Sequence, residues 1–292
     1  MGIELRAARV EDTPRILEIS SQVWEGTDYV PLVLDLWLAD EAGQFLVALI
    51  DGKVVGFAHR TYLAPGYAWL EGARTDVAYR GQGAGKAIAR RFLEDVRSEG
   101  AERIGLSAHL TNEASLHLIR AHGFQEIAWF TNLGAENETP TWPQAQRSNR
   151  VVTVPLAEAM EFVRGSRSLL VGRGFTSAGW TFYPFDRAPD GALRLSAHLL
   201  GVRDGTHLVG LLAGGYLKQG DLYPIHFLEG CEEAIEILLQ HVFHLAAGCR
   251  YIDMMTPGGM DSGLPSVPVA LKLGLKTWVE TTPDVLVFER TP

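Results

Sequence analysis

A glycine-rich segment flanked by Arg80 and Lys86 holds the residue types and spacing most able to do chemistry. An apolar run from Tyr67 to Leu70 precedes it, and a helical pattern from Ile88 to Val96 follows it, which predicts a strand, a loop and a helix. Glycines let the backbone approach a ligand, and the first N–H groups and positive dipole end of a helix attract anions. The segment therefore predicts a phosphate-binding loop.

The spacing of this loop excludes two common nucleotide motifs. A Walker A loop needs glycine five residues before Gly-Lys-Ser/Thr, but that position is Arg80, and Ala87 follows the Gly85-Lys86 pair. A dinucleotide fingerprint needs a third glycine where the chain has Lys86. The pattern that remains is Arg-x-x-Gly-x-Gly, formed by Arg80, Gly83 and Gly85.

This pattern resembles the pyrophosphate loop of the GCN5-related N-acetyltransferase (GNAT) superfamily. The resemblance implies that acetyl-CoA is the cosubstrate, that its pyrophosphate sits on loop N–H groups, and that its pantetheine arm lies along a splayed strand end. It also implies that Asn112 contacts the arm, although a helix N-cap is the alternative for this residue. The predicted cofactor-binding residues are Thr75, Asp76, Val77, Arg80, Gly81, Gln82, Gly83, Ala84, Gly85, Lys86 and Asn112.

Acetyl transfer to an amine also needs a base, a group that polarises the carbonyl, and a proton for the leaving thiolate. Glu71 is the candidate base, because an unpaired carboxylate at the end of an apolar run is costly to bury and so points to a functional role. A structural ion pair with Arg74 is its alternative. The resemblance implies that a strand bulge exposes a backbone N–H near Val77 to the carbonyl. The acid departs from the superfamily pattern: its usual tyrosine position is Ile119, which leaves Ser115 as the candidate.

A closer resemblance lies in the segment Trp24 to Pro31, in Trp37-Leu38, and in the segment Glu71 to Arg74. Together they look like the histidine N-acetyltransferase (N-acetyltransferase 16-like) group. This resemblance implies a small, amino-acid-like amine substrate. Tyr29 then becomes an aromatic wall or a core residue, Glu71 faces the amine, and Arg74 supplies a cation for a carboxylate.

The elements that position these residues follow the order β-α-α-β-β-β-α-β-α-β over residues 1–133. This is the superfamily order and predicts an α/β fold with a mixed central sheet flanked by helices. Residues 134–150 are rich in Pro, Asn, Thr and Gln and predict a linker. We expect domains at 1–133, for acetyl-CoA binding and catalysis, and at 151–292, for a GNAT-like copy that shapes the acceptor cleft.

The second half repeats the first weakly, at offsets near 150 residues, which predicts tandem GNAT folds. Asp204-Gly205 matches the hairpin turn at Asp51-Gly52, for example. The glycine loop has no counterpart, because Glu229, Glu232 and Glu233 stand in its place. Carboxylates repel a pyrophosphate, so the second copy is predicted to be degenerate and not to bind CoA.

Composition limits the partners of the 292-residue chain. A net charge of −9 argues against nucleic acid, and the absence of a long apolar run argues against a membrane partner. Two cysteines without metal-ligand spacing predict a reduced, cytoplasmic protein that holds no metal. The sequence thus predicts an N-acetyltransferase, monomeric or homodimeric, that moves an acetyl group from acetyl-CoA directly to a small primary amine. The alternative is a catalytically silent acyl-CoA-binding sensor or scaffold.

Overall fold

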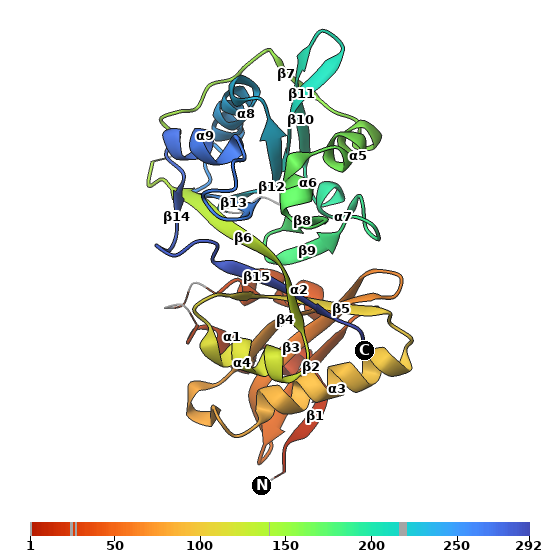
Figure 1. The fold of residues 1–292 in the computed structure, drawn as a ribbon. Helices are drawn as coiled ribbons and strands as arrows, with labels where there is room; N and C mark the ends of the chain where they lie inside the picture. Colours follow the sequence, from red (N-terminus) through yellow and green to blue (C-terminus); the bar gives the residue numbers. More distant parts are fainter. Residues whose placement is uncertain (1, 24–25, 27, 140, 216–220) are drawn as a thin grey trace. The chain divides into compact units, whose positions relative to one another are not determined.

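The computed structural model describes residues 2–23, 26, 28–139, 141–215 and 221–292. Trp24, Glu25 and Thr27 of the substrate-group resemblance lie outside the described residues. The chain forms two compact units (Figure 1). The first unit comprises Met1–Leu106, Leu118–Phe124 and Glu289–Pro292, and the second comprises Ser107–His117 and Gln125–Phe288. Each unit is formed from separate segments of the chain, whereas each predicted domain is one continuous segment. The limits of the two domains therefore stay a prediction.

The first unit is built on a mixed sheet in the order β1-β2-β3-β4-β5. Neighbouring strands are antiparallel except β4 and β5, which are parallel. Its strands are β1 (Glu4–Ala7), β2 (Gln44–Ile50), β3 (Lys53–Ala64), β4 (Tyr67–Thr75) and β5 (Arg103–His109). Its helices are η1 (Val10–Asp12), α1 (Thr13–Ser20), α2 (Val30–Leu38), η3 (Val77–Tyr79) and α3 (Ala84–Ser98), and α4 (Glu113–Ala121) enters it at Leu118.

Helices cover both faces of this sheet because β2 is apolar at every position after its first residue. Successive strand side chains point to opposite faces. Phe45, Val47 and Leu49 therefore pack with α1 and α2, while the residues between them pack with α3. The α3 helix buries a stripe at four-residue spacing, formed by Ala84, Ile88, Phe92 and Val96.

The hairpin predicted between β2 and β3 is confirmed. Ile50 pairs with Lys53 across the turn. Asp51 and Gly52 have φ values of +49° and +77°, the left-handed conformation that a two-residue hairpin turn requires.

The second unit is also built on a mixed sheet, in the order β6-β13-β12-β11-β10-β7, with β14 also paired to β6. The strands are β6 (Gln125–Glu136), β7 (Val151–Thr153), β8 (Phe175–Ala178), β9 (Thr181–Pro184), β10 (His198–Asp204), β11 (His207–Gly214), β12 (Leu222–Gly230), β13 (Tyr251–Pro257), β14 (Lys276–Thr277) and β15 (Val285–Arg290). The helices are α5 (Leu156–Arg164), α6 (Arg167–Val171), α7 (Gly191–Arg194), α8 (Glu232–Leu245) and α9 (Ser266–Lys272). The strand β6 continues to Glu136, into the segment 134–150 that was predicted to be a linker.

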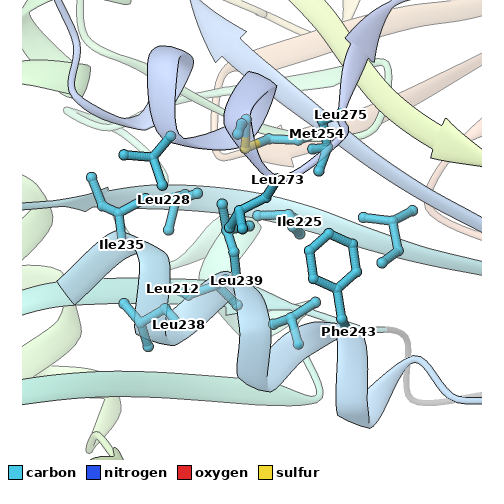
Figure 2. Packing of buried hydrophobic residues seen from close by; sticks show 14 of the residues in the cluster. Leu212, Ile225, Leu228, Ile235, Leu238, Leu239, Phe243, Met254, Leu273 and Leu275 are labelled. Atoms are coloured by element: carbon cyan, nitrogen blue, oxygen red, sulfur yellow. The ribbon is translucent and has the colours of Figure 1, made fainter. Parts of the chain in front are cut away.

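The core of the second unit gathers apolar residues of α8 and α9 against the sheet. Leu238, Leu239 and Phe243 of α8 lie with Leu212 of β11 and Ile225 of β12 (Figure 2). These residues are fully or almost fully buried, which makes this cluster the main hydrophobic contribution to folding of the unit.

The two units repeat one strand arrangement, so the predicted fold class is confirmed. The sheet order β1-β2-β3-β4-β5 of the first unit recurs as β7-β10-β11-β12-β13 in the second. In each copy a helix, α3 or α8, connects the parallel pair of strands. Between their first two strands the first copy has η1, α1 and α2, whereas the second has α5, α6, β8, β9 and α7. None of the helices in the described parts of the chain is long and apolar enough to cross a membrane.

Candidate active site

The strand β4 leaves its parallel neighbour before it ends. It pairs with β5 from Tyr67 to Leu70, opposite Arg103 to Leu106. It then continues to Thr75, and the register among described residues gives this last stretch no partner in β5. Unpaired strand N–H and C=O groups can bind an extended ligand as if it were another strand. The splayed strand end expected before the loop is therefore present.

A β-bulge lies in this stretch, which has left β5 but still pairs with β3 on its other edge. His59 pairs with Glu71 and Phe57 pairs with Arg74, so one extra residue of β4 is accommodated between them. Gly72 in the bulge has a φ of +66°, and a Cβ atom there would lie 2.2 Å from the ring of Trp37. Only glycine fits this position, because a side chain would meet both backbone strain and a packed indole.

The bulge expected near Val77 is thus at Gly72 instead, which corrects the prediction. Val77 begins the 3-10 helix η3, and its N–H donates to the Gln22 side chain at 3.2 Å. The preceding residue, Asp76, caps η3 by accepting the N–H of Ala78 at 2.8 Å and pairs with Arg15. Although burial opposes ionisation, these two contacts hold the pKa of Asp76 below its usual value. The Asp76 side chain therefore has a structural role.

The glycine loop has the geometry of an anion site. Gly81 and Gly83 have φ values of +78° and +91°, and both are exposed. Gly83 is the N-cap of α3, and no side chain among the described residues caps this helix. The first intrahelical bond runs from the Ala87 N–H to the Gly83 carbonyl, so the N–H groups of Ala84, Gly85 and Lys86 precede it.

The rest of the loop adds charge at its rim. The side chains of Arg80 and Lys86 are exposed. The Gln82 N–H, which was expected to face the pyrophosphate, donates to the Tyr79 carbonyl at 3.4 Å, a long hydrogen bond. An incoming phosphate oxygen can compete for that donor at little cost.

Arg74, the alternative partner that was expected for Glu71, forms an ion pair with Asp28. The Oε1 atom of Glu71 lies 2.9 Å from Nδ1 of His59 on the neighbouring strand. The Glu71 side chain is 16% exposed, which leaves part of the carboxyl group accessible. A partly desolvated carboxylate beside an unpaired strand edge can act as a base there.

Arg74 is held by a carboxylate of the protein itself. Its Nε and Nη2 atoms donate to the two Asp28 oxygens at 3.0 and 2.7 Å, and Ser20 donates to Asp28 as well. Its guanidinium lies 5.5 Å from the centre of the Tyr29 ring. A substrate carboxylate would therefore have to share Arg74 with Asp28, which departs from the free cation that the sequence suggested.

Tyr29 sits between these groups. Burial raises the pKa of its hydroxyl, and the charge of Glu71 raises it further. Its ring meets Trp37 edge-on, with centroids 6.2 Å apart, and packs against the apolar cluster under α2. The structure thus brings Tyr29, Glu71 and Arg74 together. Tyr29 contacts both the apolar core and this polar group.

The residues predicted on α4 belong in part to the second unit. Asn112 accepts the Ser115 N–H at 3.2 Å and so acts as an N-cap, the alternative that was left open for it. Ser115 is half-buried. Ile119, in the position where a tyrosine was sought, is 8% exposed and packs as a core residue.

Sequence reasoning missed His59, Asp40 and Gln22. The signal for His59 was an ionisable residue directly after the apolar run from Val54 to Ala58. Asp40 and Gln22 follow helices and carried no signal that distinguishes them from surface residues.

The second copy has the strand splay without the loop. Its parallel strands pair from Leu222 to Ile225 of β12, and β12 then continues to Gly230. A single residue, Cys231, connects β12 to α8, so the glycine segment is missing as predicted. The Glu229 carboxylate accepts the N–H groups of Arg167 and Ser168 at 2.8 and 2.5 Å.

These features define the class of fold, that of the GCN5-related N-acetyltransferases. Residues 11–124 match the sequence model of the Acetyltransferase (GNAT) family. A GCN5-related N-acetyltransferase from Sphaerobacter thermophilus has a similar fold, with a TM-score of 0.67 at 16% identity over 99% of this chain and 95% of that one. That similarity covers both copies, which supports the tandem fold.

Particular relatives match only part of the chain. A histidine N-acetyltransferase from Oreochromis niloticus is 29% identical over 102 residues, which are 35% of this chain and 30% of that protein. The N-alpha-acetyltransferase RimI of Mycobacterium tuberculosis is 29% identical over 120 residues, which are 40% of this chain and 74% of that protein. The match thus spans less than a third of the length of the histidine N-acetyltransferase.

Proposed function

We propose that this protein is an acetyl-CoA-dependent N-acetyltransferase that acetylates the primary amine of a small molecule, an amino acid or a related compound. The observation that carries the proposal is a bulged strand end that has left its parallel neighbour β5, joins a glycine loop and bears a partly exposed carboxylate, Glu71. Such a strand end can hold an extended donor, while the loop binds its phosphates and the carboxylate serves the amine.

The donor site is assigned to the first copy. The pyrophosphate would accept N–H groups of Ala84, Gly85 and Lys86, together with those of Gly83 and Gln82, and Arg80 adds charge. The pantetheine arm would lie along Ala73 to Thr75. We assign the donor that polarises the thioester carbonyl to the backbone at the Gly72 bulge, because the Val77 N–H already binds Gln22.

The chemistry is a direct transfer in this proposal. Glu71 takes a proton from the attacking amine, the nitrogen forms a bond to the carbonyl carbon, and the carbon–sulfur bond breaks to release CoA. Ser115 is the candidate that returns a proton to the thiolate. Neither cysteine lies in the first copy, so the proposal includes no acyl-enzyme. Tyr29 and Arg74, the latter held by Asp28, would form the wall of the acceptor pocket.

The test is release of the CoA thiol with a panel of amines. Amino acids come first, with histidine leading because of the relative that matches the first copy, and polyamines and aminoglycosides follow. We expect thiol release together with an acetylated amine in the mass spectrum. Acetyl-CoA binding without turnover on any amine would contradict the proposal and favour a sensor. Acetylated protein formed without acceptor would contradict direct transfer.

A further inference from the structure

His59 is the centre of a small polar cluster, Asp40–His59–Glu71, inside the first unit. Its Nδ1 atom lies 2.9 Å from Glu71 Oε1, and its Nε2 atom lies 3.2 Å from Asp40 Oδ2. The residue is 1% exposed. A buried imidazole is costly unless its nitrogens meet polar partners. Nδ1 is within hydrogen-bond distance of Glu71, whereas Nε2 lies near Asp40 without the geometry of a hydrogen bond.

The ring of His59 packs against two aromatic side chains. The Trp37 indole stacks on it, with centroids 4.8 Å apart and planes inclined by 11°. Phe45 meets it edge-on at 6.1 Å. Trp37 itself rests on Gly72, where a Cβ would lie 2.2 Å from the indole. The same glycine that forms the bulge therefore makes room for the residue that orients His59.

Asp40 is fixed by the chain that follows it. Its Oδ1 atom accepts the N–H groups of Ala42 and Gly43 at 3.1 and 2.9 Å, which turns Oδ2 toward His59. A Cβ at Gly43 would lie 2.1 Å from Asp40 Oδ2, so the turn requires glycine. The side chain of Asp40 is 22% exposed, against 2% for His59.

We propose that His59 is a positioning residue for the base Glu71, with Asp40 as an electrostatic neighbour of its second nitrogen. The contact of Nδ1 with Oε1 sets the rotation of the Glu71 carboxyl group. The proton then moves from the amine nitrogen to a carboxylate that is held in one orientation.

This inference rests on the proposed function, and substitutions of His59 test it. In His59→Asn the amide occupies the place of Nδ1 and can still reach Glu71, whereas in His59→Gln it replaces Nε2 and reaches toward Asp40. His59→Leu removes both contacts. We expect His59→Leu and His59→Gln to lower kcat about 10- to 100-fold. His59→Asn should restore most of that loss.

Two controls separate positioning from folding and from the donor site. The Kd of acetyl-CoA should stay unchanged in all three variants, because the loop is intact. His117→Leu, at an exposed histidine of α4, should keep the activity of the unchanged protein. Wild-type kcat in His59→Leu, or equal rescue by Asn and Gln, would overturn the inference. Failure of the unchanged protein on every amine would instead overturn the proposed function.

A second measurement does not depend on turnover. In nitrogen-15 spectra of the full chain, Glu71→Gln should shift the Nδ1 signal of His59, and Asp40→Asn should shift its Nε2 signal. The two effects on distinct nitrogens would support the cluster even if the acceptor is still unidentified. A spectrum in which neither substitution moves a His59 signal would overturn the inference.

Discussion

The strands β4 and β12 both continue beyond the stretch that pairs with a parallel neighbour, but their surroundings differ. Each strand pairs with a parallel neighbour over its first four residues, from Tyr67 in one copy and Leu222 in the other, and then continues without that neighbour. Each is bulged just after that point, near Gly72 in β4 and at His226 in β12. In this register His226 stands where the first copy has Glu71.

The difference lies in what occupies the space beyond the paired strands. In the second copy α6 and β8 pack on β13 and β12, and the cavity left among them holds only about 20 Å³. That volume suits one water molecule and excludes a pantetheine arm. In the first copy the chain past the bulge stays accessible: Ala73 is exposed and Val77 is 52% exposed.

The helices that follow show the same contrast. In the first copy a loop with two left-handed glycines leads into α3 and leaves its first N–H groups for a ligand. In the second copy the matching helix α8 follows β12 after Cys231 alone, and its first turn carries the carboxylates of Glu232 and Glu233, which disfavour an anion. The comparison teaches that a strand splay alone is a folding feature, and that the loop and the open space make it a site.

Substitution of Glu71, compared with the matched substitution of His226, should give the largest difference in kcat. Glu71→Gln keeps the shape of the side chain but removes the base, so we expect kcat to fall about 10²- to 10⁴-fold. His226→Gln, the matched change in the second copy, should leave kcat unaltered. Both are read from thiol release at saturating acetyl-CoA. Equal losses in the two variants would mean that the second copy also takes part in the chemistry.

Acidification should lower the free energy of unfolding through His226, the buried histidine of the second copy. Burial lowers the pKa of His226 to about 4 from the ordinary 6.5, so the unfolded chain takes up the proton first. Its neutral form then contributes full stability above pH 6.5, and that contribution is lost as pH falls from 6.5 to 4. The loss is about 3 kcal/mol at most.

The measurement for this prediction is urea unfolding between those two pH values. The protein should lose more stability on acidification than His226→Gln does, because titrating carboxylates are common to both and cancel. Parallel pH profiles would show that His226 is not held neutral by its surroundings.

Substitution of Gly83 should weaken the donor site. Its φ of +91° is strained for any side chain, at a cost of about 1 to 3 kcal/mol. In Gly83→Ala we expect the loop to relax and the Kd of acetyl-CoA to rise about tenfold or more. Gly205→Ala, at a left-handed turn of the second copy with open space around it, is the matched control. Unchanged affinity in Gly83→Ala would argue against the loop as the phosphate site.

Glu229→Ala should give the smallest effect and only on stability. Two N–H groups of α6 lose their acceptor, which costs about 1 to 2 kcal/mol in the free energy of unfolding. The Kd of acetyl-CoA should not change. New affinity for CoA in this variant would mean that Glu229 alone keeps the second copy from binding it.

The sequence predicted the local features well. The glycine loop and the helix α3 follow from residue spacing within one short segment, and the β2–β3 hairpin follows from Asp51-Gly52. The absence of the loop from the second copy was also visible, because Cys231 and the acidic residues after it leave no room for glycines.

What the sequence did not predict depends on pairing between distant elements. His59 meets Glu71 through the β3–β4 register, and Arg74 meets Asp28 across the sheet, so neither partner lies near in sequence. The bulge was expected near Val77, although an isolated glycine in a strand, Gly72, was the better signal. The space filled by α6 and β8 is a matter of tertiary packing, which residue patterns do not show.

Calorimetric titration of the full chain with acetyl-CoA tests the central claim most directly. The account predicts one site per chain, weakened in Gly83→Ala and unaltered in His226→Gln and Glu229→Ala. Two sites per chain, or a site that is insensitive to Gly83 and sensitive to the second-copy substitutions, would contradict it.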